Sequence, residues 1–187
     1  MSSESENKGE GPPSARDRIL SVAGRLFYRE GYRGVGVDRV IAEADVAKAT
    51  FYKHFPSKDD LIVAWINQAE AASSKTLPPA DGPHPLIAYA DAMVDIAMQP
   101  FCMGCTYQGT AAEFVDPAHP AHAAALGVKE RVLAVLTERA VTEGHGDPNA
   151  VAEGIYLLLE GVWATSRMFG AKAPLSHAKA AIRKLAS

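Results

Sequence analysis

The stretch GYRGVGVDRVIAEADVAKATFYKHFPSKDDL, Gly31–Leu61, holds the strongest structural signal in this chain of 187 residues. Gly31 follows an amphipathic run and can adopt the positive φ that ends a helix without a steric penalty. After it, apolar residues recur at intervals of three and four, which predicts one helical face formed by Val37, Val40, Ile41 and Ala44. Asp45 then lies where the chain must turn, and Asp tolerates the left-handed region better than most residues.

A second short helix is expected from Ala47 to Phe55. Phe51 and Phe55 lie four residues apart and are expected to face a core. The other face carries side chains that can donate hydrogen bonds to phosphates or base edges, namely Lys48, Thr50, Tyr52, Lys53 and His54. Two short helices joined by a tight turn, with such a face on the second, are the layout of a helix-turn-helix DNA-binding unit.

A further helix is expected to start directly after this unit. The segment Pro56–Asp60 ends the preceding helix, and Ser57 with Asp60 three residues later has the spacing of a capping box. Lys58 lies in the first turn of the new helix, where free backbone N–H groups already favour an anion. Lys58 and this helix start are therefore predicted to bind a DNA phosphate together.

The string VAKATFYKHFPSK, Val46–Lys58, resembles the recognition helix and the following helix start of the tetracycline-repressor (TetR) family of bacterial transcriptional regulators. The chain departs from the usual family pattern at Val35, where Thr is common, at Asp45 and Ala49, where Gly is common, and at Ala47, where a capping Ser is common. The resemblance implies an all-α fold, with an N-terminal three-helix helix-turn-helix domain and a C-terminal helical domain for ligand binding and dimerisation. Together with the polar face described above, it predicts a DNA-contacting set formed by Val37, Lys48, Ala49, Thr50, Tyr52, Lys53, His54 and Lys58.

Charge is distributed unevenly along the chain, whose net charge is −3. Residues 14–58 hold nine Lys or Arg against five Asp or Glu, a balance of +4, whereas residues 59–187 hold nine against fourteen, a balance of −5. A basic segment is the electrostatic footprint of nucleic-acid binding. Double-stranded DNA is therefore expected to bind to residues 14–58.

The chain is expected to divide into three parts. Residues 1–13 are polar and poor in apolar side chains, which predicts a disordered arm. Residues 14–58 form the helix-turn-helix domain, whose first helix spans Ser14–Tyr32, and residues 59–187 form the ligand-binding and dimerisation domain. In this last part, helical periodicity and proline positions predict helices from Ser57 to about residue 74, at Leu86–Met98, in the latter part of Gly104–Phe114, at Ala121–Thr142 and at Asn149–Gly170.

The segment Asn149–Gly170 is apolar on most sides, so it needs burial on more than one face. The resemblance implies a homodimer in which residues 121–142 and 149–170 form a four-helix bundle with their counterparts. Gly154 and Gly161 lie seven residues apart and would let these helices approach closely. Packing of both helices within a monomer is the alternative that periodicity alone leaves open.

The resemblance implies a ligand-responsive transcriptional regulator, most simply a repressor that leaves a palindromic operator when a small apolar or amphipathic molecule binds. The candidate ligand pocket is formed by aromatic, Met and Gln side chains of the C-terminal part, namely Tyr89, Met93, Phe101, Met103, Tyr107, Gln108, Phe114, Trp163 and Met168. Ordinary core packing is the alternative explanation for each of them, because Met and aromatic residues fill gaps in any core.

Cys102 and Cys105 leave other chemistry open. If this pair were oxidised in response to a signal, the chain would be a redox-responsive regulator. A zinc site formed by the two cysteines with His119 and His122 is a remote alternative. Buried inert thiols are the preferred explanation. No nucleophile elbow, phosphate loop, dinucleotide fingerprint or zinc-protease motif is present, so neither an enzyme nor a cofactor is predicted.

The sequence carries no sign of membrane attachment. No apolar run reaches the roughly 18 residues that a membrane-spanning helix needs. The first residues, MSSESENKGEGPPS, lack the apolar core of a signal peptide. A cytoplasmic location without a membrane partner is therefore expected.

Overall fold

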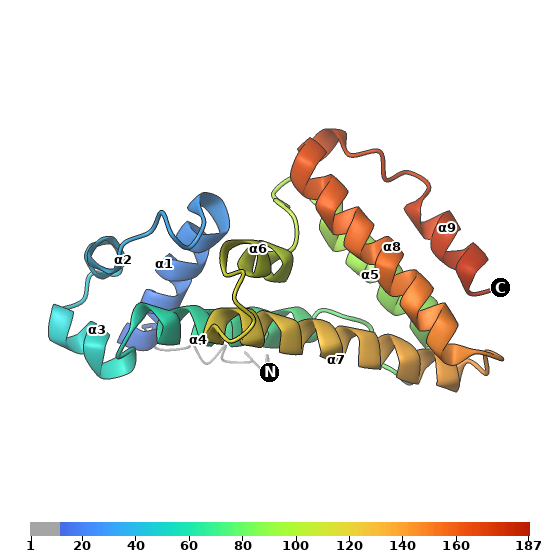
Figure 1. Cartoon of the computed structure of the whole chain (residues 1–187), viewed down its shortest axis with the longest axis horizontal. Helices are drawn as coiled ribbons and strands as arrows, with labels where there is room; N and C mark the ends of the chain where they lie inside the picture. The colour runs from blue at the N-terminus through green and yellow to red at the C-terminus, as the bar shows by residue number, and fades with distance from the viewer. Residues whose placement is uncertain (1–11) are drawn as a thin grey trace, which may run out of the picture. The chain divides into compact units, whose positions relative to one another are not determined.

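The computed structural model describes residues 12–187. Within that range the regular secondary structure is helical throughout, with nine α-helices and one short 3-10 helix (Figure 1), which confirms the predicted all-α class. The chain forms two compact units, here called unit 1 and unit 2, which divide between Ile62 and Val63. The predicted arm, residues 1–13, lies outside the described residues except for Pro12 and Pro13.

Unit 1 is built from three helices and the start of a fourth, namely α1 (Ala15–Glu30), α2 (Val37–Glu43), α3 (Lys48–His54) and α4 (Lys58–Ser74). The hydroxyl of Ser14 accepts a hydrogen bond from the backbone N–H of Asp17 at 3.2 Å and so caps α1. At the other end of α1, Gly31 has a φ of 78°, a conformation that favours glycine. These two local signals place α1 within two residues of its predicted bounds.

The core of unit 1 joins α1, α2 and α3 through their apolar faces. α1 supplies Ile19, Leu20, Leu26 and Phe27, and α2 supplies Val40. Phe51 and Phe55 are 0% and 2% exposed, and their ring centroids lie 6.0 Å apart, which confirms that this side of α3 faces the core. α3 is therefore held by two aromatic anchors on one side, which leaves its other side free for contacts.

Unit 2 contains the remainder of α4 and, in chain order, α5 (Pro85–Ala97), α6 (Thr106–Glu113), α7 (Pro120–Thr142), α8 (Pro148–Phe169), η1 (Gly170–Lys172) and α9 (Ala178–Leu185). Proline opens α5, α7 and α8, where its missing N–H costs nothing. The carboxylate of Asp147 caps α8 by accepting the backbone N–H of Ala150 at 3.1 Å. Within the described residues, no helix combines the length and the apolar composition needed to cross a membrane.

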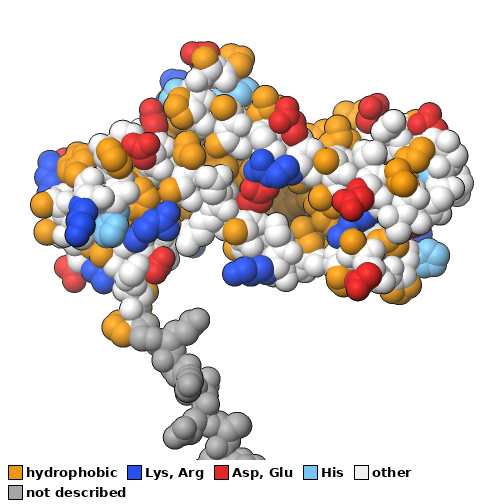
Figure 2. Space-filling view, turned by 90° about the horizontal axis from the view of Figure 1, so that it is seen from below, with side chains coloured by type: hydrophobic (Ala, Val, Ile, Leu, Met, Phe, Trp, Pro, Cys, Tyr) orange, Lys and Arg blue, Asp and Glu red, His pale blue; other side chains and the backbone are white. Residues whose placement is uncertain are grey.

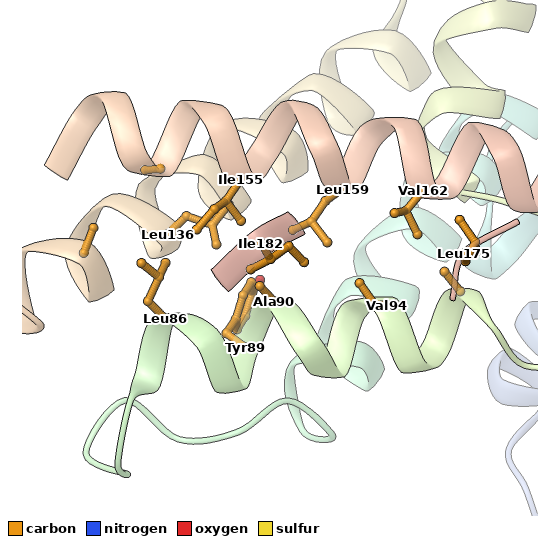
Figure 3. Packing of buried hydrophobic residues seen from close by; sticks show 13 residues of the cluster. Leu86, Tyr89, Ala90, Val94, Leu136, Ile155, Leu159, Val162, Leu175 and Ile182 are labelled. Carbon is orange, nitrogen blue, oxygen red and sulfur yellow. The ribbon is translucent and has the colours of Figure 1, made fainter. Parts of the chain in front are cut away.

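The core of unit 2 lies between α5, α7, α8 and α9. Figure 3 shows their buried side chains facing one another, with Leu86, Tyr89, Ala90 and Val94 from α5, Leu136 from α7, Ile155, Leu159 and Val162 from α8, and Ile182 from α9. The apolar stripe predicted for α5 is the face that packs on α8. α8 itself is covered on several sides by helices of its own chain, which accounts for part of its apolar composition.

α9 was not predicted from the sequence. Its Ile182 is fully buried, while Lys179 and Arg183 pair with Asp95 and Asp91 of α5. Docking of α9 also places Leu185 next to Gly154, where an added Cβ would lie at an ordinary contact distance of 3.6 Å. A Cβ on Gly161 would meet nothing within 4 Å in this chain.

A buried arginine joins α7 to the loop before α5. Arg139 is 7% exposed and donates to the carbonyl oxygens of Pro85 at 2.8 Å and Pro78 at 2.7 Å. Its guanidinium lies 4.6 Å from the centroid of the Tyr89 ring. Burial lowers the pKa of Arg139, while the same burial raises the pKa of Tyr89. These bonds attach the loop before α5, and the first residue of α5, to α7.

Candidate nucleic-acid interface and effector site

The outer face of α3 is polar and open to solvent. Lys48, Ala49, Lys53 and His54 are exposed, and Tyr52 is 44% exposed. The Tyr52 ring stands edge-on to Phe51, with centroids 5.3 Å apart, so its position is supported by the core. Thr50, which lies between the two faces of α3, is half-buried. Five of the eight predicted DNA contacts thus share one open helix face.

The start of α2 lies beside the start of α3. Val37 is half-buried there, and the carboxylate of Asp38 lies 3.1 Å from the ammonium of Lys48. The hydrogen bond that Lys48 donates to Asp38 raises the pKa of Lys48 above its ordinary value. Both side chains are largely exposed, so a phosphate that approaches Lys48 meets a cation already paired with a carboxylate.

The start of α4 has the predicted capping box. The hydroxyl of Ser57 accepts the backbone N–H of Asp60 at 3.1 Å and donates to its carboxylate at 2.7 Å. Lys58 is the first residue of α4 and is half-buried. Two carboxylates, Asp59 and Asp60, follow it in the first turn, so Lys58 supplies the positive charge at a helix start that is otherwise acidic.

Ion pairs that the sequence analysis did not identify connect α2 to α1. Arg39 of α2 pairs with Glu30 of α1 at 2.5 Å and with Glu43 at 2.9 Å, and Arg25 of α1 also pairs with Glu43 at 2.7 Å. Hydrogen bonds from Arg39 lower the pKa of Glu30, and those from Arg25 and Arg39 lower the pKa of Glu43. The spacing of four residues between Arg39 and Glu43 was the one sequence signal for this network.

A cluster of polar side chains lies inside unit 2, between α6, α7 and α8. The ammonium of Lys129 pairs with the carboxylate of Glu160 and lies 5.9 Å from the centroid of the Tyr156 ring. The side-chain amide of Gln108 donates to the Glu160 carboxylate at 2.8 Å and to its backbone carbonyl at 3.1 Å. Lys129 and Glu160 are only 14% and 23% exposed, so this polar cluster, here called the Lys129 cluster, is largely shielded from solvent.

The thiol of Cys105 belongs to the same cluster. Burial would lower the pKa of Lys129, but its interactions with Cys105 and Glu160 outweigh burial and raise it. Both cysteines are free and buried, and Cys102 accepts the backbone N–H of Gly104 at 3.4 Å. Cys105 is therefore a buried thiol with a charged neighbour.

The two histidines of the zinc alternative are engaged elsewhere. A ring nitrogen of His119 accepts the backbone N–H of Ala121 at 3.2 Å, and its ring stacks on Phe114. A ring nitrogen of His122 lies 2.7 Å from the carbonyl oxygen of Phe114. Across the part of the chain that the structure describes, no three His, Cys, Asp or Glu side chains come together as metal ligands.

The nine predicted pocket residues do not all lie inside unit 2. Tyr89 is buried, and six are half-buried, namely Met93, Met103, Tyr107, Gln108, Phe114 and Trp163. Phe101 and Met168 are 74% and 81% exposed, so they do not line the interior of this chain. Figure 2 shows a hollow with hydrophobic walls and with acidic and basic side chains at its rim. Of the predicted pocket residues, Gln108 belongs to the Lys129 cluster. Cys105 was predicted only as a redox candidate, and Lys129, Tyr156 and Glu160 were not predicted.

A helix-turn-helix unit joined to an all-helical second unit is the architecture of a DNA-binding regulator. The family model described as "Bacterial regulatory proteins, tetR family" matches residues 19–65. A TetR-family transcriptional regulator from Streptomyces coelicolor is 36% identical in sequence, with 92% of this chain and 94% of that chain aligned at a TM-score of 0.81. The chain belongs to the TetR family of bacterial transcriptional regulators, which confirms the resemblance seen in the sequence.

Two further relatives extend the comparison. The transcriptional repressor NemR of Escherichia coli K12 is 23% identical over 184 residues, which cover 91% of this chain and 92% of NemR. The structure of reduced NemR aligns with a TM-score of 0.78. The transcriptional regulator LmrA of Bacillus subtilis is 40% identical over 55 residues, only 29% of either chain. These relatives are regulators of transcription and not enzymes.

Proposed function

We propose that this protein is a repressor that binds a palindromic operator as a homodimer and leaves it when a small amphipathic molecule binds to unit 2. The observation that carries the proposal is the polar outer face of α3, which is held from behind by Phe51 and Phe55. Repression, in preference to activation, is supported by the name of NemR.

In this proposal α3 enters the major groove of the operator. Lys48, Lys53 and Lys58 bind phosphates through their ammonium groups, which act as point charges. These contacts position the protein on the DNA but carry little sequence information. Tyr52, Thr50 and His54 reach base edges or neighbouring phosphates from the same helix. Val37 and Ala49, the remaining two predicted contacts, approach the DNA closely without adding charge.

Dimerisation is proposed through α7 and α8, within residues 121–142 and 149–170. Large apolar side chains on these helices are exposed in the single chain, namely Leu126, Val141, Leu157, Met168 and Phe169. Exposed apolar groups on two neighbouring helices indicate a protein interface. A two-fold axis would place two recognition helices on successive major grooves, roughly 34–36 Å apart or a multiple of it.

The effector site is proposed at the Lys129 cluster and the half-buried residues predicted for the pocket. The cluster offers a cation, a carboxylate and an amide within an apolar interior, so it suits a ligand with an apolar body and a hydrogen-bonding group. A ligand that binds the DNA-incompetent form more tightly shifts the population of dimers away from the operator. Operator and ligand must weaken each other's binding equally.

A thiol-dependent response is the second candidate, supported by the contact between Cys105 and Lys129. The two routes differ in one measurement, because Cys105→Ser would abolish a response to oxidant but leave release by a non-covalent ligand intact. Cys102→Ser is the companion variant, because it replaces the other buried thiol of the pair.

The proposal is tested first by selecting duplexes from a random pool and measuring their binding by fluorescence anisotropy in a salt series. A palindromic consensus and two protomers per duplex in sedimentation are expected. Tyr52→Ala should weaken binding to the selected duplex strongly, whereas Leu157→Arg should yield a monomer that no longer binds. Val115→Arg, at an equally exposed site outside α7 and α8, is the control. A dimeric Leu157→Arg variant would refute the proposed interface.

A further inference from the structure

The turn between α2 and α3 contains a strained residue. Asp45 has a φ of 50°, in the left-handed region that favours glycine, and it is one of two non-glycine residues with positive φ among residues 12–187. The position of α3 depends on this turn, because α3 has only seven residues and Ala47 makes no side-chain cap to it. Relaxation of Asp45 would therefore change the direction in which α3 leaves the turn.

A single side chain of α1 holds this turn. Arg18 donates from Nε to the carbonyl oxygen of Ala44 and from Nη2 to that of Asp45, both at 3.2 Å. The guanidinium is a planar fork that can bind two neighbouring carbonyls at once, and it stays charged at any relevant pH. Its third contact, from Nη1 to the carbonyl oxygen of Pro13 at 3.4 Å, also goes to the backbone.

The other links between α1 and α2 are of a different kind. Arg25 and Arg39 form ion pairs with Glu43 and Glu30 between exposed side chains, and exposed pairs of this kind contribute little. Arg18 is half-buried and bonds backbone carbonyls that lie past the end of α2. Such carbonyls have no partner inside a helix. Arg18 thus stabilises the turn itself, whereas the ion pairs attach α2 to α1.

We infer that Arg18 is a positioning residue for DNA recognition, which fixes the direction of α3 by binding the carbonyls of Ala44 and Asp45 and so stabilising the left-handed turn. This inference rests on DNA binding through α3, but its first test does not require DNA. The turn is expected to need Arg18 because residue 45 is Asp, for which the left-handed conformation is strained. With glycine there, the same backbone conformation would carry no strain.

The test combines Arg18→Met with Asp45→Gly. Arg18→Met should lower affinity for the selected duplex on the order of tenfold, as expected for loss of charge-assisted bonds. Binding to unrelated DNA and the salt slope should stay unchanged, because Arg18 bonds the protein backbone and not phosphate. Asp45→Gly alone should have little effect, and adding it to Arg18→Met should restore most of the lost affinity.

Arg18→Lys and Arg29→Met are the companion variants. Arg18→Lys keeps the charge but cannot bind two carbonyls in a plane, so it should behave like Arg18→Met. Arg29→Met removes the same charge from an exposed site on α1 and should be neutral. A parallel loss of specific and unrelated binding, with a lower salt slope, would instead make Arg18 a phosphate contact and overturn the inference.

Hydrogen exchange of the free protein separates this inference from the proposed operator. Arg18→Met should speed exchange at the hydrogen-bonded amides of Asp45, Val46 and Phe51 relative to those of α1, and Asp45→Gly should reverse the change. Unchanged exchange at these amides would overturn the inference even if DNA binding fell. If the wild-type chain bound no palindromic duplex, the exchange result would still stand, and only the proposed operator would fail.

Discussion

Ala47→Ser is expected to stabilise the protein, because the backbone of Ala47 has the conformation of an N-cap residue but its side chain cannot cap α3. Ala47 has φ and ψ of −68° and 147°, close to the −59° and 160° of Ser14, whose hydroxyl caps α1. In α1 and α4 the capping hydroxyl accepts the N–H three residues later at 3.2 Å and 3.1 Å. A hydroxyl at position 47 would reach the N–H of Thr50 in the same way.

The magnitude follows from this geometry. Replacing Ala by a capping Ser raises the free energy of unfolding by about 1 kcal/mol when the backbone already has the N-cap conformation. For a chain of this length, 1 kcal/mol corresponds to a rise of roughly 2–4 °C in Tm. No rearrangement reduces the gain, because Ala47 is exposed and the new hydroxyl displaces nothing.

Calorimetry and urea unfolding followed by circular dichroism measure this change, with Ala49→Ser as the matched control. Ala49 is also exposed and lies within the first turn of α3, where a hydroxyl cannot cap, so its replacement should be neutral or slightly destabilising. Ser14→Ala should show the opposite change, a loss of about 1 kcal/mol. Equal stability of Ala47→Ser and the wild-type protein, or an equal gain from Ala49→Ser, would refute the capping argument.

Three further outcomes are expected. Lys58→Ala should weaken binding to all duplexes alike and lower the salt slope by about 0.9, the contribution of one phosphate contact; an unchanged slope in anisotropy would remove it from the interface. Asp38→Asn should free Lys48 from its carboxylate and strengthen DNA binding at low salt, an effect that should vanish when Lys48 is also replaced by Ala. Arg39→Met should flatten the acid limb of the stability curve only slightly, as followed by urea unfolding, because these pairs are exposed. Its two carboxylate partners have pKa values lowered from 4.5, so the stability that they contribute is present above that pH and is lost as the pH falls through the lowered values.

Helix positions were predictable because their signals are local. Ser14, Gly31 and the capping box at Ser57 each act within four residues, and the structure starts and ends helices beside them. The alternation of Phe51 and Phe55 with polar neighbours was enough to separate the inner and outer faces of α3. The left-handed conformation of Asp45 was also predictable, since few other residues tolerate a sharp turn.

The Lys129 cluster and the docking of α9 could not be predicted in this way. Lys129 and Glu160 lie 31 residues apart, and α9 binds α5 through Arg183 and Asp91, which lie 92 residues apart. No spacing rule links such residues, because their meeting depends on how whole helices pack. For the same reason, spacing along α8 could not show that Gly154 lies beside Leu185 of its own chain.

Local sequence was therefore sufficient for the helices, their caps and the polar face of α3, since these follow from backbone conformation and a period of 3.6 residues. Tertiary packing alone brought Arg18 to the carbonyls of the turn, placed Lys129 beside Cys105 and Glu160, and exposed Phe101 and Met168. The physical difference is one of range. Capping and periodicity act over one or two helical turns, whereas burial and the pairing of distant charges are properties of the assembled helices.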